Sequence, residues 1–176
     1  MLNHKGTATL TTPRLTLRRF EIADAQAMFD NWASDPVVTR FLTWPPHKSV
    51  DVTRAVISSW VERGSAEWCI VPKEFGEAMG SMGVVNVDGD TVEVGYCLSQ
   101  KCWGRGYAAE ALKATIQALF AMGARRVTAK HDVNNPNSGR VMQKAGMVWL
   151  ENRRAVVSPA LGERDLVVYH IDNSER

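Results

Sequence analysis

Residues 93–111 read EVGYCLSQKCWGRGYAAEA and join a predicted strand, a glycine-containing loop and the start of a long helix. The backbone N–H groups of residues 104–108 should point at whatever lies over the N-terminus of that helix. Such groups bind a phosphate or pyrophosphate, and the helix dipole favours the negative charge. Glycine lets a ligand approach the backbone closely, and Arg105 adds a cation. The loop is therefore a candidate phosphate-binding site.

Three interpretations of this loop compete. An isolated Gly-x-Gly pair can be a turn that only starts a helix. The run from Gly104 to Ala109 also fits the dinucleotide-binding pattern, but residues 99–103 separate its first glycine from the strand, which that glycine should follow directly. A Walker phosphate loop is excluded because the chain contains no Gly-Lys-Ser/Thr. The third interpretation is the pyrophosphate loop of an acyl-CoA enzyme.

Upstream of this loop, the sequence predicts two helices between strands. Alternating apolar and polar residues favour a strand over residues 14–19. Helical spacing predicts one helix over residues 23–33, which Asp35-Pro36 ends, and another over residues 50–63, with Ser49 as N-cap and Gly64 as the stop. Three further strands, joined by turn residues, form an antiparallel meander and cover residues 67–71, 79–87 and 91–98.

Downstream, two more helices alternate with strands. The predicted helices cover residues 106–122, before Gly123, and 136–145, after Asn135 as candidate N-cap. The predicted strands cover residues 126–131, 147–150 and 165–171, the last two joined through a turn region at Ser158-Pro159 and Gly162. This order predicts an α/β fold, a mixed sheet with helices on both faces. No stretch reads as a linker, so residues 1–176 are expected to form a single domain.

Composition narrows the function classes. The chain has 45% hydrophobic and 23% charged residues and a net charge of +2, so neither disorder nor generic binding to nucleic acid or membranes is expected. The first 12 residues lack the apolar core of a signal peptide, which predicts a cytoplasmic location. Cys69, Cys97 and Cys102 show no Cys-x-x-Cys spacing and the histidines show no ligand spacing, so neither a disulfide framework nor a metal site is expected.

A second segment favours the acyl-CoA interpretation. Residues 135–147, NPNSGRVMQKAGM, resemble an Asn-x-x-Ser helix that ends in Lys-x-Gly-Phe. Together with residues 93–98 and 103–108, this segment resembles the GNAT superfamily of acetyl-CoA-dependent N-acetyltransferases. Residues 12–18, TPRLTLR, and 44–47, WPPH, resemble its RimJ/RimL branch, named for ribosomal-protein N-terminal acetyltransferases. The resemblance extends over roughly residues 12–170.

The resemblance implies a fold, a cofactor site and a reaction. The fold is a mostly antiparallel mixed sheet flanked by helices, with a splayed cleft into which pantetheine inserts. The residues implied in binding acetyl-CoA are Tyr96, Cys97, Leu98, Trp103, Gly104, Arg105, Gly106, Tyr107, Ala108, Asn135 and Ser138. Trp103 replaces the Gln or Arg that usually opens the loop, so no side-chain contact to pyrophosphate is implied there.

The implied reaction moves acetyl from acetyl-CoA directly to a primary amine in a ternary complex. The acceptor expected for this branch is a protein N-terminal α-amine. A small amine, such as a polyamine, amino acid or aminoglycoside, is the alternative within the same class, and an acyl-CoA-binding module without turnover is the alternative outside it. No metal takes part, and the protein is expected to be a monomer or a homodimer.

Three residues are expected to carry the chemistry, each with a plainer alternative. Glu93 is either a solvated strand carboxylate or the general base, acting through water. The backbone N–H of Cys97 would stabilise the thioester oxyanion, while its thiol is expected to be a buried apolar group rather than a nucleophile. Ser138 either belongs to an ordinary first helical turn or protonates the departing thiolate, a role for which Tyr107 ranks lower.

Two further expectations concern the acceptor side. Trp44 and His47 lie in a proline-rich segment and either line the acceptor pocket or serve the structure. Gly95 interrupts a good strand and is either a harmless small residue or the mark of a bulge.

Overall fold

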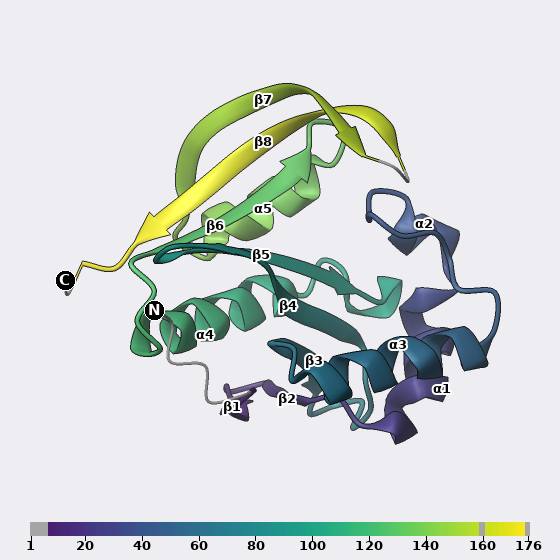
Figure 1. The fold of residues 1–176 in the computed structure, drawn as a ribbon. Coiled ribbons are helices and arrows are strands. Elements are labelled where there is room, and N and C mark those ends of the chain that lie inside the picture. The colour runs from purple at the N-terminus through teal and green to yellow at the C-terminus, as the bar shows by residue number, and fades with distance from the viewer. Residues whose placement is uncertain (1–6, 159–160, 175–176) are drawn as a thin grey trace.

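The computed structural model describes residues 7–158 and 161–174; the predicted turn residue Pro159 lies outside these ranges. One sheet of eight strands runs in the order β1-β2-β3-β4-β5-β6-β8-β7 (Figure 1). Its strands are β1 (Leu10–Thr11), β2 (Leu15–Arg19), β3 (Glu67–Pro72), β4 (Gly80–Asp88), β5 (Thr91–Leu98), β6 (Arg126–Asp132), β7 (Val148–Ser158) and β8 (Gly162–Asp172). Of the neighbouring pairs in these ranges, only β5 and β6 are parallel. The predicted mixed, mainly antiparallel sheet is confirmed.

The helix predicted before Asp35-Pro36 has the expected extent but changes type along its length. A 3₁₀ turn (Ile22–Asp24) leads into α1 (Ala25–Met28) and then a π-helical turn (Phe29–Ala33). Asp35 then caps α2 (Pro36–Thr39), because its carboxylate accepts a hydrogen bond from the N–H of Val37. The Asp-Pro pair therefore ends one helix and begins another, which the sequence did not predict.

The three longer helices match their predictions closely. The helix α3 (Val50–Arg63) begins after Ser49, whose side chain accepts from the N–H of Val52, and ends at Gly64 in the left-handed region. The helices α4 (Tyr107–Ala121) and α5 (Pro136–Lys144) also lie within a residue or two of the predicted ranges. No helix that the structure describes is both long and apolar enough to cross a membrane.

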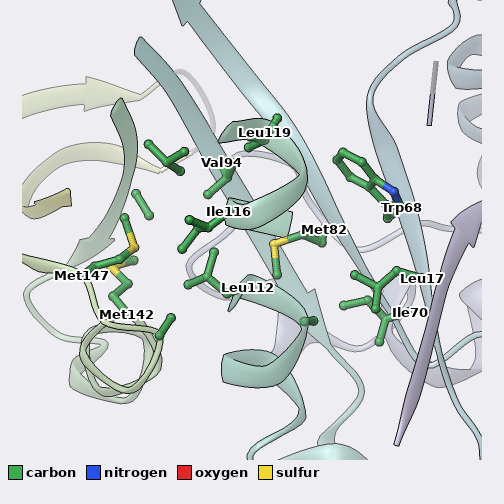
Figure 2. Packing of buried hydrophobic residues seen from close by; sticks show 14 of the residues in the cluster. Leu17, Trp68, Ile70, Met82, Val94, Leu112, Ile116, Leu119, Met142 and Met147 are labelled. Carbon is green, nitrogen blue, oxygen red and sulfur yellow. The ribbon is translucent and has the colours of Figure 1, made fainter. Parts of the chain in front are cut away.

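Two hydrophobic clusters bury the two faces of the central strands. On one face, Leu112 and Ile116 of α4 and Met142 of α5 pack against strand residues such as Met82 and Val94 (Figure 2). On the other face, α1 and α3 lie side by side (Figure 1), and the second cluster gathers residues that include Trp32, Ile57, Cys69 and Cys97. Because both faces are covered, β3 to β5 lie at the centre of the hydrophobic core.

The sheet opens between β5 and β6. The two strands pair only from Thr91 with Arg126 to Glu93 with Thr128, although β5 continues to Leu98 and β6 to Asp132. This divergence confirms the splayed opening that the resemblance implies. A bulge is present beside it, but on β4 rather than at Gly95, because Val84 pairs with Val94 and Asn86 pairs with Glu93. Val85 is the extra residue, and Gly95 makes room for its side chain: a Cβ on Gly95 would lie 2.9 Å from Val85 Cγ2.

The last two strands are much longer than predicted. Each has 11 residues, and the β7–β8 hairpin arches beyond the rest of the sheet (Figure 1). Most of β7 is exposed and carries no alternation of apolar and polar residues, so its sequence gave only a short apolar signal at residues 147–150.

Candidate active site

One end of the opening is formed by the loop from β5 to α4. Gly104 and Gly106 have φ angles of 72° and 80°, a region that favours glycine. Nothing lies within 4 Å of a Cβ built on Gly104, and one on Gly106 would meet Arg14 Nη2 at 3.4 Å. Gly106 occupies the N-cap position of α4, where the described structure shows no capping hydrogen bond from a side chain. The first N–H groups of α4 therefore remain available, which fits a pyrophosphate.

The loop is braced from the beginning of β2, which sequence reasoning missed. Arg14 donates from Nη1 to the carbonyl of Arg105 at 2.8 Å and from Nε to Glu110 Oε2 at 2.7 Å. The hydroxyl of Thr12 donates to the same carboxylate, to Oε1, at 2.6 Å. The Arg14 guanidinium also lies over the ring of Tyr107, 4.7 Å from its centroid. The motif TPRLTLR thus has a physical role, because it holds the glycine loop in place.

The side chains of the loop itself are mostly engaged with protein. The guanidinium of Arg105 forms an ion pair with Glu74, so its charge is compensated before any phosphate arrives. The Tyr107 hydroxyl donates to Glu74 at 2.6 Å, and this hydrogen bond raises the pKa of Tyr107. Trp103 donates from Nε1 to the carbonyl of Leu98 at 2.9 Å. These contacts favour the backbone, rather than side chains, as the phosphate-binding part.

The expected oxyanion donor needs a correction. The N–H of Ser99 donates to the carbonyl of Met79, on the β4 side of β5, at 2.8 Å. The N–H groups of alternate residues point to the same side of a strand, and the β4–β5 register is regular here. The N–H of Cys97 therefore points toward β4 and away from the opening, whereas those of Tyr96 and Leu98 face it.

The thiol of Cys97 is buried, as expected, and lies on the sheet face that α1 and α3 cover. Its Sγ lies 3.5 Å from Ser81 Oγ, and burial raises the pKa of the thiol to about 11. A thiol with that pKa is almost fully protonated at neutral pH and is a poor nucleophile. The structure thus favours the apolar interpretation of Cys97.

The other side of the opening is formed by the start of α5. The hydroxyl of Tyr96 donates to the carbonyl of Ser138 at 2.9 Å, and its oxygen lies 2.9 Å from Ser138 Oγ. Burial raises the pKa of Tyr96. This hydroxyl pair bridges β5 and α5 across the opening, and sequence reasoning found Ser138 but not the hydroxyl of Tyr96.

Asn135 occupies the N-cap position of α5, but its side chain forms no capping hydrogen bond there. The carbonyl of Asn135 accepts from the N–H of Ser138 at 3.2 Å. The predicted N-cap position of Asn135 is thus correct, although its side chain does not cap the helix. Its amide is left available for a ligand beside the hydroxyl pair.

Glu93, the expected general base, and the two expected acceptor-side residues, Trp44 and His47, already have partners within the protein. Glu93 Oε1 lies 2.8 Å from Lys130 Nζ, and the side chains are 16% and 37% exposed, respectively. The Nδ1 of His47 lies 2.8 Å from Thr53 Oγ1, and burial lowers the pKa of His47. The rings of Trp44 and His47 lie 5.0 Å apart. Within residues 7–158 and 161–174, no group of three or more His, Cys, Asp and Glu side chains is placed to hold a metal ion.

The chain is similar to acetyltransferases along most of its length. The family described as acetyltransferase (GNAT) domain matches residues 14–148. The protein named "Uncharacterized N-acetyltransferase p20" of Bacillus licheniformis is 32% identical over 152 residues, covering 80% of this chain and 85% of its own. The structure of a GNAT-family acetyltransferase from Bacillus anthracis has a TM-score of 0.85 at 24% identity and covers 94% of this chain and 98% of its own. RimL, a ribosomal L7/L12 alpha-N-protein acetyltransferase solved with coenzyme A, has a TM-score of 0.84 at 18% identity, with 96% and 100% covered. This chain belongs to the GNAT family of acetyltransferases.

Proposed function

We propose that this acetyltransferase moves acetyl from acetyl-CoA to a protein N-terminal α-amine, as a member of the RimJ/RimL-like branch. The observation that carries the cofactor assignment is the opening between β5 and β6, with the uncapped start of α4 at one end. The acceptor assignment is supported by the segments at residues 12–18 and 44–47 and by the similar fold of RimL, which acts on a protein α-amine. We expect the reaction to take place in the cytoplasm.

The residues around the opening suit direct transfer in a ternary complex. The N–H groups of Tyr96 and Leu98 would stabilise the oxyanion of the thioester carbonyl, because they face the opening. Ser138, hydrogen-bonded to the Tyr96 hydroxyl, would return a proton to the departing sulfur. Cys97 would not carry acetyl, because its thiol stays protonated.

The test offers acetyl-CoA with a panel of amines and identifies the products by mass. The panel contains a peptide with a free α-amine, the same peptide with a blocked N-terminus and an internal lysine, a polyamine, an amino acid and an aminoglycoside. We expect acetylation of the free α-amine and little acetylation of the blocked peptide. Acetylation of the small amines but of neither peptide would show that the acceptor is a small amine rather than a protein N-terminus. Hydrolysis of acetyl-CoA without transfer to any amine would leave an acyl-CoA-binding module.

A further inference from the structure

The α4–α5 face of the opening is closed by packed side chains. There the hydroxyl of Tyr96 joins β5 to Ser138 of α5, and Met142 of α5 packs in the hydrophobic cluster below α4. Side chains alternate between the two faces of a strand, so Gly95, next to Tyr96, belongs to the other face. An acceptor amine would therefore reach a thioester in the opening from the face of Gly95.

The side chain that lies over Gly95 comes from the neighbouring strand. Val85 is the extra residue of the bulge in β4, and a bulge can aim a side chain in a new direction. Its Cγ2 lies 2.9 Å from a Cβ built on Gly95; apart from the chain neighbours of Gly95, no other atom of the described residues lies within 4 Å of that Cβ. Val85 thus supplies the side chain that position 95 lacks.

This valine lies beside the peptide group that faces the thioester. Gly95 and Tyr96 share one peptide bond, and the N–H of that peptide points into the opening. Pairing between β5 and β6 stops at Glu93, two residues before Gly95. The Val85 side chain therefore borders the opening at the level of the proposed thioester carbonyl, on the face from which the amine would approach.

Val85 also offers apolar surface that is still in contact with water. The residue is 63% exposed, although one of its methyl groups packs on Gly95. Its neighbours along that face of β5 are engaged, because Glu93 pairs with Lys130 and the Cys97 thiol is buried. An apolar group of a substrate that covered Val85 would release water from both surfaces, which favours binding.

The classes of amine acceptor differ at the carbon that bears the nitrogen. In an N-terminal α-amine, that carbon carries the side chain of the first residue, unless the residue is Gly. In a lysine side chain or a polyamine, the same carbon is a CH₂ group. A substituent on this carbon is the part of the acceptor nearest to the reacting nitrogen, so it meets whatever borders the thioester.

We propose that Val85 contacts the substituent on the carbon that bears the reacting nitrogen, and that it selects acceptors with a small apolar group there. This inference rests on the proposed function, for which the substituent is the side chain of the first residue of the acceptor protein. Contact with Val85 would orient the amine toward the thioester. A charged side chain would lose water against the valine without gaining a partner.

The experiment compares Val85→Ala and Val85→Thr with the wild type. Thr keeps the branched shape of Val but is polar. The matched control is Val87→Thr, also on β4 and 49% exposed, which lies on the other face because Val87 pairs with Val92 of the cluster below α4. The acceptors are three peptides that differ only in a first residue of Ala, Gly or Asp, together with alaninamide and glycinamide. The kcat and KM for each acceptor, the KM for acetyl-CoA and the melting temperature are measured for every protein.

We expect the wild type to prefer the Ala peptide over the Gly peptide about tenfold in kcat/KM, the low end for one methyl group in an apolar site, because Val85 is partly exposed. The Asp peptide should be no better than the Gly peptide. Both Val85 variants should reduce the Ala-to-Gly ratio to about twofold or less, by slowing the Ala peptide and hardly changing the Gly peptide. The KM for acetyl-CoA should stay the same, and Val87→Thr should behave as the wild type.

A folded Val85→Thr protein with the wild-type Ala-to-Gly ratio would overturn the inference, and so would a wild type without any preference for Ala. A raised KM for acetyl-CoA in the Val85 variants, with an unchanged ratio, would show that Val85 lines the cofactor instead. A wild type that acetylates alaninamide but no peptide would refute the protein acceptor alone, and the ratio of alaninamide to glycinamide would then decide the role of Val85. A wild type that acetylates none of the five would refute the proposed function, and this contact would fall with it.

Discussion

The buried carboxylate of Glu67 predicts a pH-dependent stability that Glu67→Gln should remove. Burial raises its pKa from about 4.5 to about 7, so the folded state binds more protons than the unfolded state between these values. The contribution of Glu67 to stability is therefore greatest below about pH 4.5 and is lost as pH rises through about 7, where the folded state must hold a charged carboxylate. The pKa difference corresponds to about 3 kcal/mol of unfolding free energy, an upper value because water can reach an ionised group. Gln carries no charge and can keep the hydrogen bond from Ser81.

The assay is thermal unfolding of both proteins at a series of pH values. At about pH 8.5, Glu67→Gln should melt above the wild type by at most roughly 6–12 °C, since about 1 kcal/mol shifts the melting temperature by 2–4 °C in a chain of this size. Near pH 4.5 the two curves should nearly coincide. The exposed Glu62→Gln variant should follow the wild type throughout. A difference between Glu67→Gln and wild type that is equal at both ends of the range would refute the reasoning.

Three further predictions concern the cofactor site. Gly106→Val should lower CoA affinity, measured by calorimetry, at least about tenfold, because losing one hydrogen bond to a charged group costs about 1.5–3 kcal/mol. The control is Gly123→Val, which strains the other end of α4, where φ is 106°, and should leave CoA affinity unchanged. Equal losses of affinity in the two variants would contradict the assignment of the phosphate site. Ser138→Ala should reduce kcat about 10- to 100-fold with little change in CoA affinity, and Tyr96→Phe should resemble it; an unchanged kcat in both would remove the hydroxyl pair from the reaction. Glu110→Gln should raise the KM for acetyl-CoA up to about fivefold, since a partly exposed ion pair contributes at most about 1 kcal/mol, and a fall in kcat alone would argue against a bracing role.

Local sequence signals predicted most of the fold, because the capping residues and glycines that the sequence shows also bound the helices of the structure. Ser49 and Gly64 bound α3 as caps, and α4 begins within one residue of the predicted start, directly after the glycine loop. The long β7–β8 hairpin escaped prediction, because an exposed strand has no buried face to impose alternation. The helix over residues 23–33 was found, but its 3₁₀ and π turns depend on packing that the sequence pattern does not carry.

The site was predicted less completely, because its decisive contacts join distant segments. The motif around Gly106 was evident, yet Arg14, which braces that loop, lies about 90 residues away in the sequence. The direction of the Cys97 N–H depends on the register with β4, and no local pattern specifies that register to one residue. Glu67 gave no signal either, because its carboxylate lies where a side chain at Gly83, on a neighbouring strand, would stand.

The alternation along β5 accounts for how two substrates can meet in one opening. Val92 and Val94 face the cluster under α4, and the cofactor side of the strand continues with Tyr96, whose hydroxyl reaches α5. The other face of the strand carries Glu93, Gly95 and Cys97. It faces the cluster formed with α1 and α3, where Glu67 lies. A thioester entering between β5 and β6 would thus meet the Tyr96–Ser138 hydroxyl pair, while Glu93, paired with Lys130, belongs to the other face of β5. Gly83 leaves the space that the Glu67 carboxylate fills, and Gly95 leaves the space that the Val85 side chain fills.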